Sequence, residues 1–458
     1  MSACTLAPDL PKAPQHPADY YEASQSLAAP HPTPWPNQAW WRRYQDPQLD
    51  QLMQEALTGS PDLAAASARL QRAQGYAQQA GALLAPQAGM NLSATKQKLS
   101  YNNGNDFVPR NWNDYGSATL NFSYEFDFWG KNRSAVSAAK STLAAAEAEQ
   151  QQARLILTTT LAQAYAELAR LYANRDTSVT AQQIREQTVK LFRQRYDNGL
   201  ETRGSVRQVE ALQASAEADL LAVEEAIALQ RHALAALLGK GPDRGLAVER
   251  PTVQLASSFG LPTQASADLL GHRPDITAAR WRAEAAASRV GMAQADYYPN
   301  VNLSAYVGTQ ALGLNNLGQS GSDVGGVGPA LYLPLFTAGR LDGQLTAAQA
   351  DYLEAVASYN ASVTQAFHDV ADAVTSHQAL DKRLQKSREA VQAATDAYQI
   401  ANNRYRGGLA TYLDVLTAED ALLASQMSLV NLESRAFSLD VALVYALGGG
   451  YANPHSSL

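Results

Sequence analysis

The sequence predicts an α+β protein made of two equivalent halves, each combining a pair of strands with a very long helical hairpin. The first observation is an internal repeat, because residues 339–448 repeat residues 130–239 at a constant offset of 209 positions (339 − 130), without an insertion. The second is a switch, at the same point of each half, from a period of two to a helical pattern. The third is the lack of helix breakers over about 60 residues in each half, far beyond the ordinary helix length.

The composition favours a largely neutral, polar surface. Of the 458 residues, 46% are hydrophobic and 17% are charged, against about 25% charged in typical soluble domains. The net charge of −7 gives no reason to expect a nucleic-acid partner, which would require a clustered basic face, so we expect none. No apolar run approaches the ~18 residues of a membrane-spanning helix, so a crossing of a bilayer would have to use strands.

A single cysteine, Cys4, excludes an internal disulfide framework and any site with several thiolate ligands. Met1-Ser2-Ala3-Cys4 is similar to the end of a bacterial lipoprotein signal, in which small residues precede a cysteine that becomes the acylated N-terminus. We therefore expect Cys4 to carry acyl chains such as palmitate. The alternative is a chance cysteine in a loose tail.

The segment 4–45 is predicted to be an extended N-terminal tether. It is rich in proline, which fixes φ and removes a backbone donor, so the segment should not be helical. Trp35, Trp40 and Trp41 close it, and we expect their rings to dock the tether on the body of the protein.

Two segments, 46–86 and 272–298, are predicted to form upper helices in equivalent positions of the halves. Asp46-Pro47 offers an N-cap followed by proline at the first helical position, and Ser60-Pro61 repeats this arrangement. Arg273-Pro274 opens a helix in the same way in the second half.

The segments 87–129 and 299–338 are predicted to form four strands, two in each half. In residues 118–128, one face is apolar and aromatic: Leu120, Phe122, Tyr124, Phe126 and Phe128. Such a row opposite polar residues is typical of a strand in a membrane barrel. The alternative is a soluble hairpin whose apolar face packs on a core. The glycines of 325–328 lack the context of a phosphate loop, and we expect a turn of the barrel there.

The segments 130–239 and 339–448 are predicted to form the long helical hairpins. Their first helices run to about residues 192 and 402, and ~60 residues at ~1.5 Å each would span about 90 Å. A rod of that length cannot bury its apolar stripe within its own domain, so the rods must pack side by side. The segments 240–271 and 449–458 are an equatorial linker and a C-terminal segment.

Several motifs together resemble the outer-membrane efflux factor family, the TolC and OprM type of exit duct. They are the Tyr-x-x-Gly-Leu-x-Thr turns at 196–202 and 405–411, the helix start Arg273-Pro274-Asp275-Ile276, the strand-to-helix junction Leu335-Phe336-Thr337-Ala338-Gly339-Arg340, and the end Ala446-Leu447-Gly448-Gly449-Gly450. The similarity covers residues 4–450. Cys4 and the final glycines place the chain nearer to the OprM members.

The number of chains needed follows in part from the strands. Four strands are too few to close a barrel, and open strand edges are not viable in lipid, so several chains must join. Two copies would give eight strands and a filled interior, whereas three would give twelve and leave a passage. The resemblance implies a homotrimer: a transmembrane β-barrel in outer-membrane lipid, continuous with a long periplasmic α-helical barrel.

The resemblance also implies that the hairpin tips contact the periplasmic adaptor, or membrane fusion, protein of a tripartite pump. The matching positions are Gly199, Leu200, Thr202, Gly408, Leu409 and Thr411. A local explanation is that the glycines supply the positive φ of a tight turn and that the threonines cap helices. Both explanations can hold.

A periplasmic aperture is the second site that the resemblance implies. Asp414 matches an acidic ring that narrows the closed aperture, and three converging carboxylates would repel anions and attract cations. Tyr405 matches an aromatic residue that holds neighbouring helix pairs. The alternative for Asp414 is a capping box with Thr411.

Two positions depart from the TolC pattern near the aperture. Ala410 stands where that pattern has an arginine, and Thr417 where it has a second aspartate. We therefore expect the closing contacts to depend on Tyr405, Tyr412 and Leu413.

No catalytic or metal-binding pattern is found, and we expect neither enzyme activity nor a cofactor. His368-Asp369 and His377 are expected to be solvated helix residues. The implied function is a passive exit duct, lipid-anchored in the outer membrane with a large periplasmic portion, for drugs or other small toxic compounds driven by a resistance-nodulation-division transporter. The alternatives are a type I duct for proteins or peptides and a non-conducting periplasmic coiled-coil scaffold.

Overall fold

The computed structural model describes residues 22–23, 25–27, 33–100, 102, 110–253, 261–262 and 265–452, and for residues 265–268 the backbone alone. Cys4 and most of the predicted tether lie outside this part of the chain. The described residues divide into two compact units. Unit 1 comprises Arg69–Glu147 and Ala278–Asn360, and unit 2 comprises the rest.

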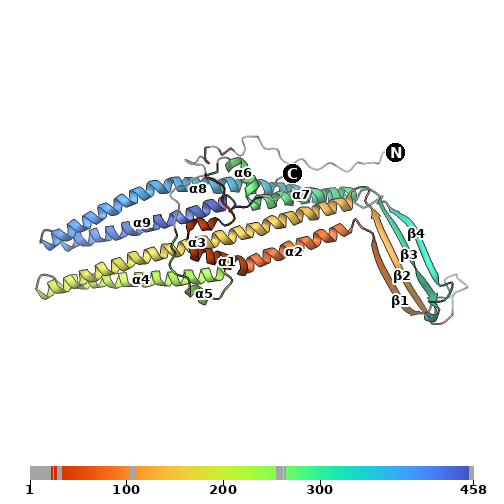
Figure 1. Ribbon diagram of the computed structural model, residues 1–458, viewed down its shortest axis with the longest axis horizontal. Helices are drawn as coiled ribbons and strands as arrows, with labels where there is room; N and C mark the ends of the chain where they lie inside the picture. The colour runs from red at the N-terminus through yellow and green to blue at the C-terminus, as the bar shows by residue number, and fades with distance from the viewer. Residues whose placement is uncertain are drawn as a thin grey trace. The chain divides into compact units, whose positions relative to one another are not determined.

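Unit 1 contains a four-stranded antiparallel sheet in the order β1-β2-β3-β4 (Figure 1). The strands are β1 (Gln87–Gln97), β2 (Asn113–Phe126), β3 (Asn300–Leu312) and β4 (Asp323–Tyr332). Within the described residues, β1 and β4 each pair with one strand only. Each therefore leaves an edge of unpaired backbone donors and acceptors.

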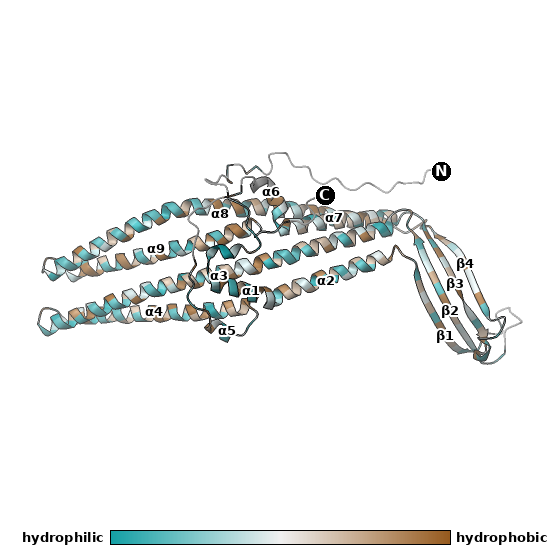
Figure 2. Cartoon of the chain, in the orientation of Figure 1, coloured by the Kyte–Doolittle hydropathy of each residue, from teal (hydrophilic) through white to brown (hydrophobic). Residues whose placement is uncertain are grey.

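The sheet has one apolar and one polar face, and the alternation along the strands can be followed in Figure 2. The register places Met90 beside Leu120, Phe122 beside Ala305, and Ala305 beside Val327 on the apolar face. Met90 is 65% exposed and Val327 is 76% exposed, so this face is not the buried face of a soluble hairpin. The register gathers on the opposite face Asn91, Ser93, Thr119, Asn121, Ser123, Glu125, Asn302 and Ser304.

The prediction of a turn at residues 325–328 is wrong, because these glycines lie inside β4, which begins at Asp323 and ends at Tyr332. Gly326 pairs with Tyr306 of β3, and a Cβ on Gly326 would lie 2.9 Å from the ring of Tyr306. Glycine leaves room for the aromatic ring, which a larger side chain would have to displace. The connection between β3 and β4 comes earlier, at η2 (Leu314–Asn316) and at Gly321 with φ +92°.

The strands of unit 1 connect to the ends of long helices. These are α2 (Pro61–Ala82), α3 (Lys131–Asp197), α7 (Pro274–Ala295) and α8 (Arg340–Arg406). Asp127 fixes the start of α3, because its carboxylate accepts hydrogen bonds from the backbone N–H groups of Asn132 (3.0 Å) and Arg133 (2.8 Å). Asp127, the first residue after β2, therefore caps the start of α3.

Unit 2 contains the helical hairpins formed by α3 with α4 (Arg203–Leu237) and by α8 with α9 (Tyr412–Ala446). The repeat is visible in their lengths, because α3 and α8 each have 67 residues and α4 and α9 each have 35. At ~1.5 Å per residue, α3 and α8 are each about 100 Å long. They continue about one turn beyond the ends that the sequence suggested.

The largest core of unit 2 forms where η1 (Trp40–Tyr44) and α1 (Pro47–Gly59) pack against α3 and α9. Trp40 and Trp41 are 3% and 5% exposed, which confirms that these rings dock on the body. The prediction of a wholly non-helical segment 4–45 is wrong at η1. The proline run ends at Pro36, and a 3-10 turn can then bring Trp40, Trp41 and Tyr44 into one core.

The predicted cap at Asp46 is confirmed and also ties α1 to α3. Its carboxylate accepts from the backbone N–H groups of Gln48 (2.9 Å) and Leu49 (3.2 Å). The hydroxyl of Tyr165, on α3, donates to the other oxygen at 2.9 Å. Burial and this neighbouring carboxylate raise the pKa of Tyr165 well above its usual range, despite a hydrogen bond from Gln48.

The linker 240–271 contains α5 (Asp243–Leu246) and most of α6 (Ala265–His272), and Arg273 follows directly. Arg273 is 3% exposed, pairs with Asp275 (2.7 Å) and Asp369 (2.8 Å), and donates to the carbonyl of Ala446 (3.3 Å). Asp369 is thus not the solvated residue expected, because a buried guanidinium requires carboxylate partners. Arg273 joins the start of α7 to α8 and to the end of α9.

The two histidines of α8 differ in their exposure to solvent. His368 is exposed, as expected, and lies 3.4 Å from Asp372. His377 is half-buried, which corrects the expectation of a solvated residue. Burial lowers the pKa of His377 more than a backbone contact at Leu439 raises it, so it is neutral at pH 7.

Candidate functional site

The two hairpin tips of unit 2 have the same turn. Gly199 and Gly408 have φ +71° and +72°, which favours glycine. In both turns the following leucine donates its backbone N–H back to the helix: Leu200 to the carbonyl of Arg195 and Leu409 to that of Arg404, each at 2.8 Å. Two helix ends of this kind satisfy the last carbonyls of α3 and α8 in the same way.

The restart of each second helix depends on a threonine. Thr202 accepts from the backbone N–H of Ser205 at 3.1 Å. Thr411 donates its backbone N–H (2.8 Å) and its hydroxyl (2.7 Å) to the carboxylate of Asp414. These hydrogen bonds lower the pKa of Asp414, which keeps its charge. The capping explanation therefore holds for Thr202, Thr411 and Asp414, whichever further role they have.

Beneath the turns, an apolar cluster joins the two hairpins. It contains Val189, Phe192, Val206, Val209, Tyr405 and Val415. Phe192 of α3 is fully buried and meets Tyr412 of α9 edge-on, with ring centroids 4.0 Å apart. Tyr405 and Tyr412 are 5.6 Å apart. Two of the predicted aperture residues therefore lie together in a contact between the hairpins.

A polar contact accompanies this cluster. The Tyr405 hydroxyl donates to Glu201 at 2.9 Å, and Arg195 lies 3.5 Å from Glu201 and 4.9 Å from the centre of the Tyr405 ring. Burial and the neighbouring carboxylate raise the pKa of Tyr405 to about 12, so its hydroxyl keeps the proton that it donates. Glu201 was missed from the sequence. The signal available was a difference between the repeats, because Ala410 occupies the equivalent position.

The other predicted tip residues point to solvent. Leu200 is 63% exposed, Leu409 73% and Leu413 67%, and Asp414 is also exposed. Leucines this exposed bury little apolar surface within their own hairpin. They are therefore available to a partner or to a second copy.

A buried ion pair near the tips was also missed. Arg185 of α3 is 6% exposed and lies 3.1 Å from Glu419 of α9, which is 0% exposed. Glu419 shares the buried stripe of α9 with Val415, Leu416 and Leu422. A carboxylate at helical spacing within an apolar stripe was the signal in the sequence.

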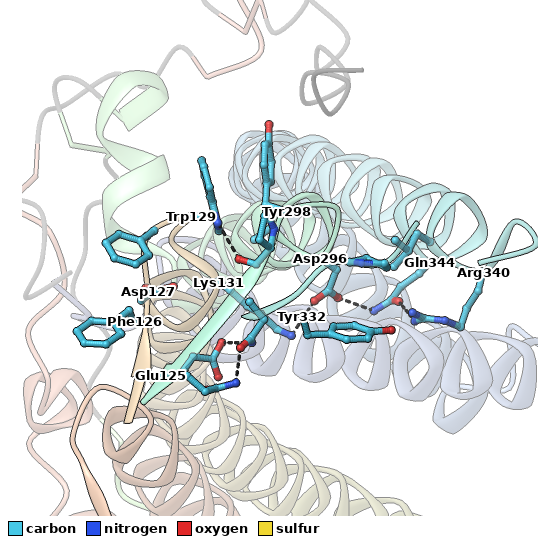
Figure 3. A pocket seen from close by; sticks show the side chains of 17 residues that line it. Glu125, Phe126, Asp127, Trp129, Lys131, Asp296, Tyr298, Tyr332, Arg340 and Gln344 are labelled. Atoms are coloured by element: carbon cyan, nitrogen blue, oxygen red, sulfur yellow. Dashed lines mark hydrogen bonds and ion pairs between the residues drawn. The ribbon is translucent and has the colours of Figure 1, made fainter. Parts of the chain in front are cut away.

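A polar cavity of about 470 Å³ lies in unit 1, where the strands meet the helix ends (Figure 3). Glu125 accepts from Asn300 at 2.6 Å, and Lys131 pairs with Asp296 at 2.7 Å. Glu125 belongs to the polar face of the sheet, and Phe126, on the apolar face, also lines the cavity. These charges neutralise or hydrogen-bond one another, an arrangement suited to lining a wet surface and not to catalysis.

Among the residues that the structure describes, no helix combines the length and the hydropathy needed to cross a membrane. Across the same residues, no cluster of three or more His, Cys, Asp or Glu side chains is placed to bind a metal ion.

An amphipathic sheet with open edges, followed by doubled rods joined at their tips, defines one chain of an outer-membrane channel. The sequence model of the outer membrane efflux protein family matches residues 52–240 and 265–449. The chain belongs to this family, and it is an outer-membrane efflux protein and not an enzyme.

Individual relatives support the same family assignment. The chain is 37% identical over 364 residues to the fusaric acid resistance protein FusA of Burkholderia cepacia, covering 76% of this chain and 67% of FusA. It is 32% identical to the multidrug resistance outer membrane protein MdtP of Escherichia coli K12, covering 91% and 87%. The crystal structure of the outer membrane protein VceC of Vibrio cholerae superimposes with a TM-score of 0.87 at 59% identity, covering 91% of this chain and all of VceC. The predicted fold class, that of the trimeric channels with four strands per chain, is confirmed.

Proposed function

We propose that three copies of this chain form the passive outer-membrane duct of a tripartite efflux pump, closed at rest by the hairpin tips. The observation that carries the proposal is the sheet of unit 1. Its apolar face is exposed, and its two edges are unpaired within the described residues. In lipid each unpaired backbone group costs several kcal/mol, so the edges must meet strands of other copies.

Twelve strands suit a duct better than eight. An eight-stranded barrel is filled by its own side chains, whereas a larger barrel leaves a passage. The polar face of the sheet consists mainly of asparagine, serine and threonine, with Gly326 and Gly328 among them. Short polar side chains would line a water-filled route.

The tips supply the closure. The Tyr405–Glu201 hydrogen bond and the Phe192–Tyr412 contact join the two hairpins of one copy, so splaying of the hairpins must break both. Leu413 and Asp414 are exposed beside these contacts, and we place them at the aperture. Three Asp414 carboxylates there would attract cations and repel anions. The duct itself does no work.

The partners follow from the exposed tips. Leu200 and Leu409, with the glycines and threonines of the same turns, would meet a periplasmic adaptor protein, and a resistance-nodulation-division transporter would supply the energy. FusA is named for resistance to fusaric acid and MdtP for multidrug resistance. We therefore propose drugs or other small toxic compounds as the cargo.

Conductance in planar bilayers tests the duct. Purified protein should be trimeric and should give discrete channel openings. Protein that inserts but never conducts would instead support a non-conducting scaffold. Cells lacking their own channel should regain drug resistance when the chain is expressed with its pump. Restored protein secretion without drug resistance would support a type I duct.

The N-terminal anchor remains a separate proposal. Cys4 lies outside the described residues, and the support for acylation is the Ser2-Ala3-Cys4 sequence. Mass spectrometry of the N-terminal peptide from native membranes should show added acyl chains, and an unmodified mass would refute the anchor.

A further inference from the structure

Near the tips, α3 and α9 enclose a second contact, separate from Tyr405 and Glu201. Arg185 is 6% exposed and Glu419 is 0% exposed. Nε of Arg185 lies 3.1 Å from Oε1 of Glu419, and another guanidinium nitrogen pairs with Asp420. Within the described part of the chain, neither carboxylate oxygen of Glu419 accepts an aligned hydrogen bond. Glu419 therefore sits in a dry contact with one cation that it must share.

Ionisation of Glu419 is costly in this setting, because burial disfavours the charged form. Arg185, which also pairs with Asp420, offsets little of this cost. Burial raises the pKa of Glu419 to about 7; Arg185 lowers it in part, and Asp420 raises it further. In water the same carboxyl would have a pKa of 4.5. The packed arrangement thus favours the protonated form below about pH 7, where the same carboxyl in water would already be ionised.

The two tyrosines beside Glu419 do not titrate in this range. Burial, and then the charge of Glu419, raise the pKa values of Tyr398 on α8 and Tyr412 on α9, so both stay neutral. The charged groups that also face these tyrosines are Arg185 on α3 and Arg406 on α8. The sequence has no histidine in 180–220 or 390–430. Glu419 is therefore the group placed to respond to pH near the tips.

We propose that Arg185 and Glu419 form a proton-operated latch that holds the two hairpins of one copy together beside the aperture. The proposal rests on the tip closure proposed above, because splaying of the hairpins separates α3 from α9 and admits water to Glu419. The dry contact between α3 and α9 stabilises protonated Glu419. Ionised Glu419 is better solvated in the open state.

The sign of the pH effect follows from the two pKa values. The closed state has its full advantage below pH 4.5 and loses it as pH rises through about 7. The open fraction should therefore increase between pH 4.5 and about pH 7 and level off above pH 7. The difference between the pKa of Glu419 in water and in the contact limits the change in the opening equilibrium to about 300-fold per copy.

Conductance of the full-length trimer, recorded across this pH window, tests the latch. Glu419→Gln keeps the shape but cannot ionise, so we expect low conductance that no longer rises with pH. Glu433→Gln is the matched control, because Glu433 lies on the same helix in an exposed pair with Arg388 (3.2 Å). It should keep the wild-type profile.

Asp420→Asn provides a second variant that should fold, since Asp420 is 64% exposed. Without the Asp420 carboxylate, Arg185 pairs with Glu419 alone, and a negative charge next to Glu419 is removed. The midpoint of the pH profile should therefore fall. An unmoved midpoint, or a pH response that survives in Glu419→Gln, would overturn the latch while leaving the duct intact. A protein that never conducts would overturn the duct and the latch together.

Discussion

The tip closure makes a quantitative prediction for Tyr405→Phe. Tyr405 is 5% exposed, and its hydroxyl donates to the Glu201 carboxylate at 2.9 Å. A hydrogen bond to a charged acceptor contributes about 1.5–3 kcal/mol. The lower end applies here, because Glu201 keeps Arg195 and is not left unpaired. A loss of ~1.5 kcal/mol shifts the opening equilibrium about tenfold per copy.

Channel recordings in planar bilayers measure this shift as open probability. Sensitivity of cells to a large antibiotic that the outer membrane normally excludes gives a second readout, since a leaky duct should admit it. The internal repeat supplies the control. Tyr196 is the equivalent of Tyr405 in the first hairpin but is 45% exposed, so Tyr196→Phe should leave both readouts unchanged. Unchanged opening in Tyr405→Phe, or an equal effect in Tyr196→Phe, would refute the closure.

Three further predictions concern the aperture, the start of α7 and the sheet. Asp414→Ala should raise conductance and weaken cation preference in bilayer recordings; an unchanged conductance would leave Asp414 as a helix cap only. Arg273→Met should lower stability in urea unfolding by about 3 kcal/mol, since it removes the cation shared by two half-buried carboxylates, whereas Arg280→Met, in an exposed pair, should cost less than about 1 kcal/mol. Gly326→Val should sharply reduce the yield of assembled trimer in membranes, because a ring covers its Cβ position; Gly328→Val, which meets nothing within 4 Å, should assemble normally, and equal yields would contradict this account.

Much of the fold was predictable because its signals are local. Proline after Asp46 marks a helix start, and alternation in 118–128 marks a strand. Gly199 and Gly408 mark turns that require positive φ. Each of these signals acts over a few residues and does not depend on the rest of the chain.

The errors arose where packing overrides a local signal. Glycine is a poor strand former, so residues 325–328 suggested a turn, yet Gly326 lies in β4 and leaves room for the ring of Tyr306. Trp40 and Trp41 follow a proline run, yet burial of their rings favours a compact 3-10 turn. Asp369 resembled an ordinary surface residue until Arg273 was seen to be buried against it.

The site at the tips divides in the same way. Tyr405, Tyr412 and the turn residues stand out from the repeated motif. Glu201 and Arg185 do not, because each matters only through a partner on the other hairpin.

By itself, the sequence determined the doubling, the order of strands and rods, and the positions of the two hairpin tips, since period, proline and glycine act at short range. Only the tertiary structure decided which side chains meet between the hairpins. Tyr405 and Glu201 are 204 positions apart, and their contact depends on how two long helical hairpins lie against each other. That placement results from packing summed over many residues, so no short pattern encodes it.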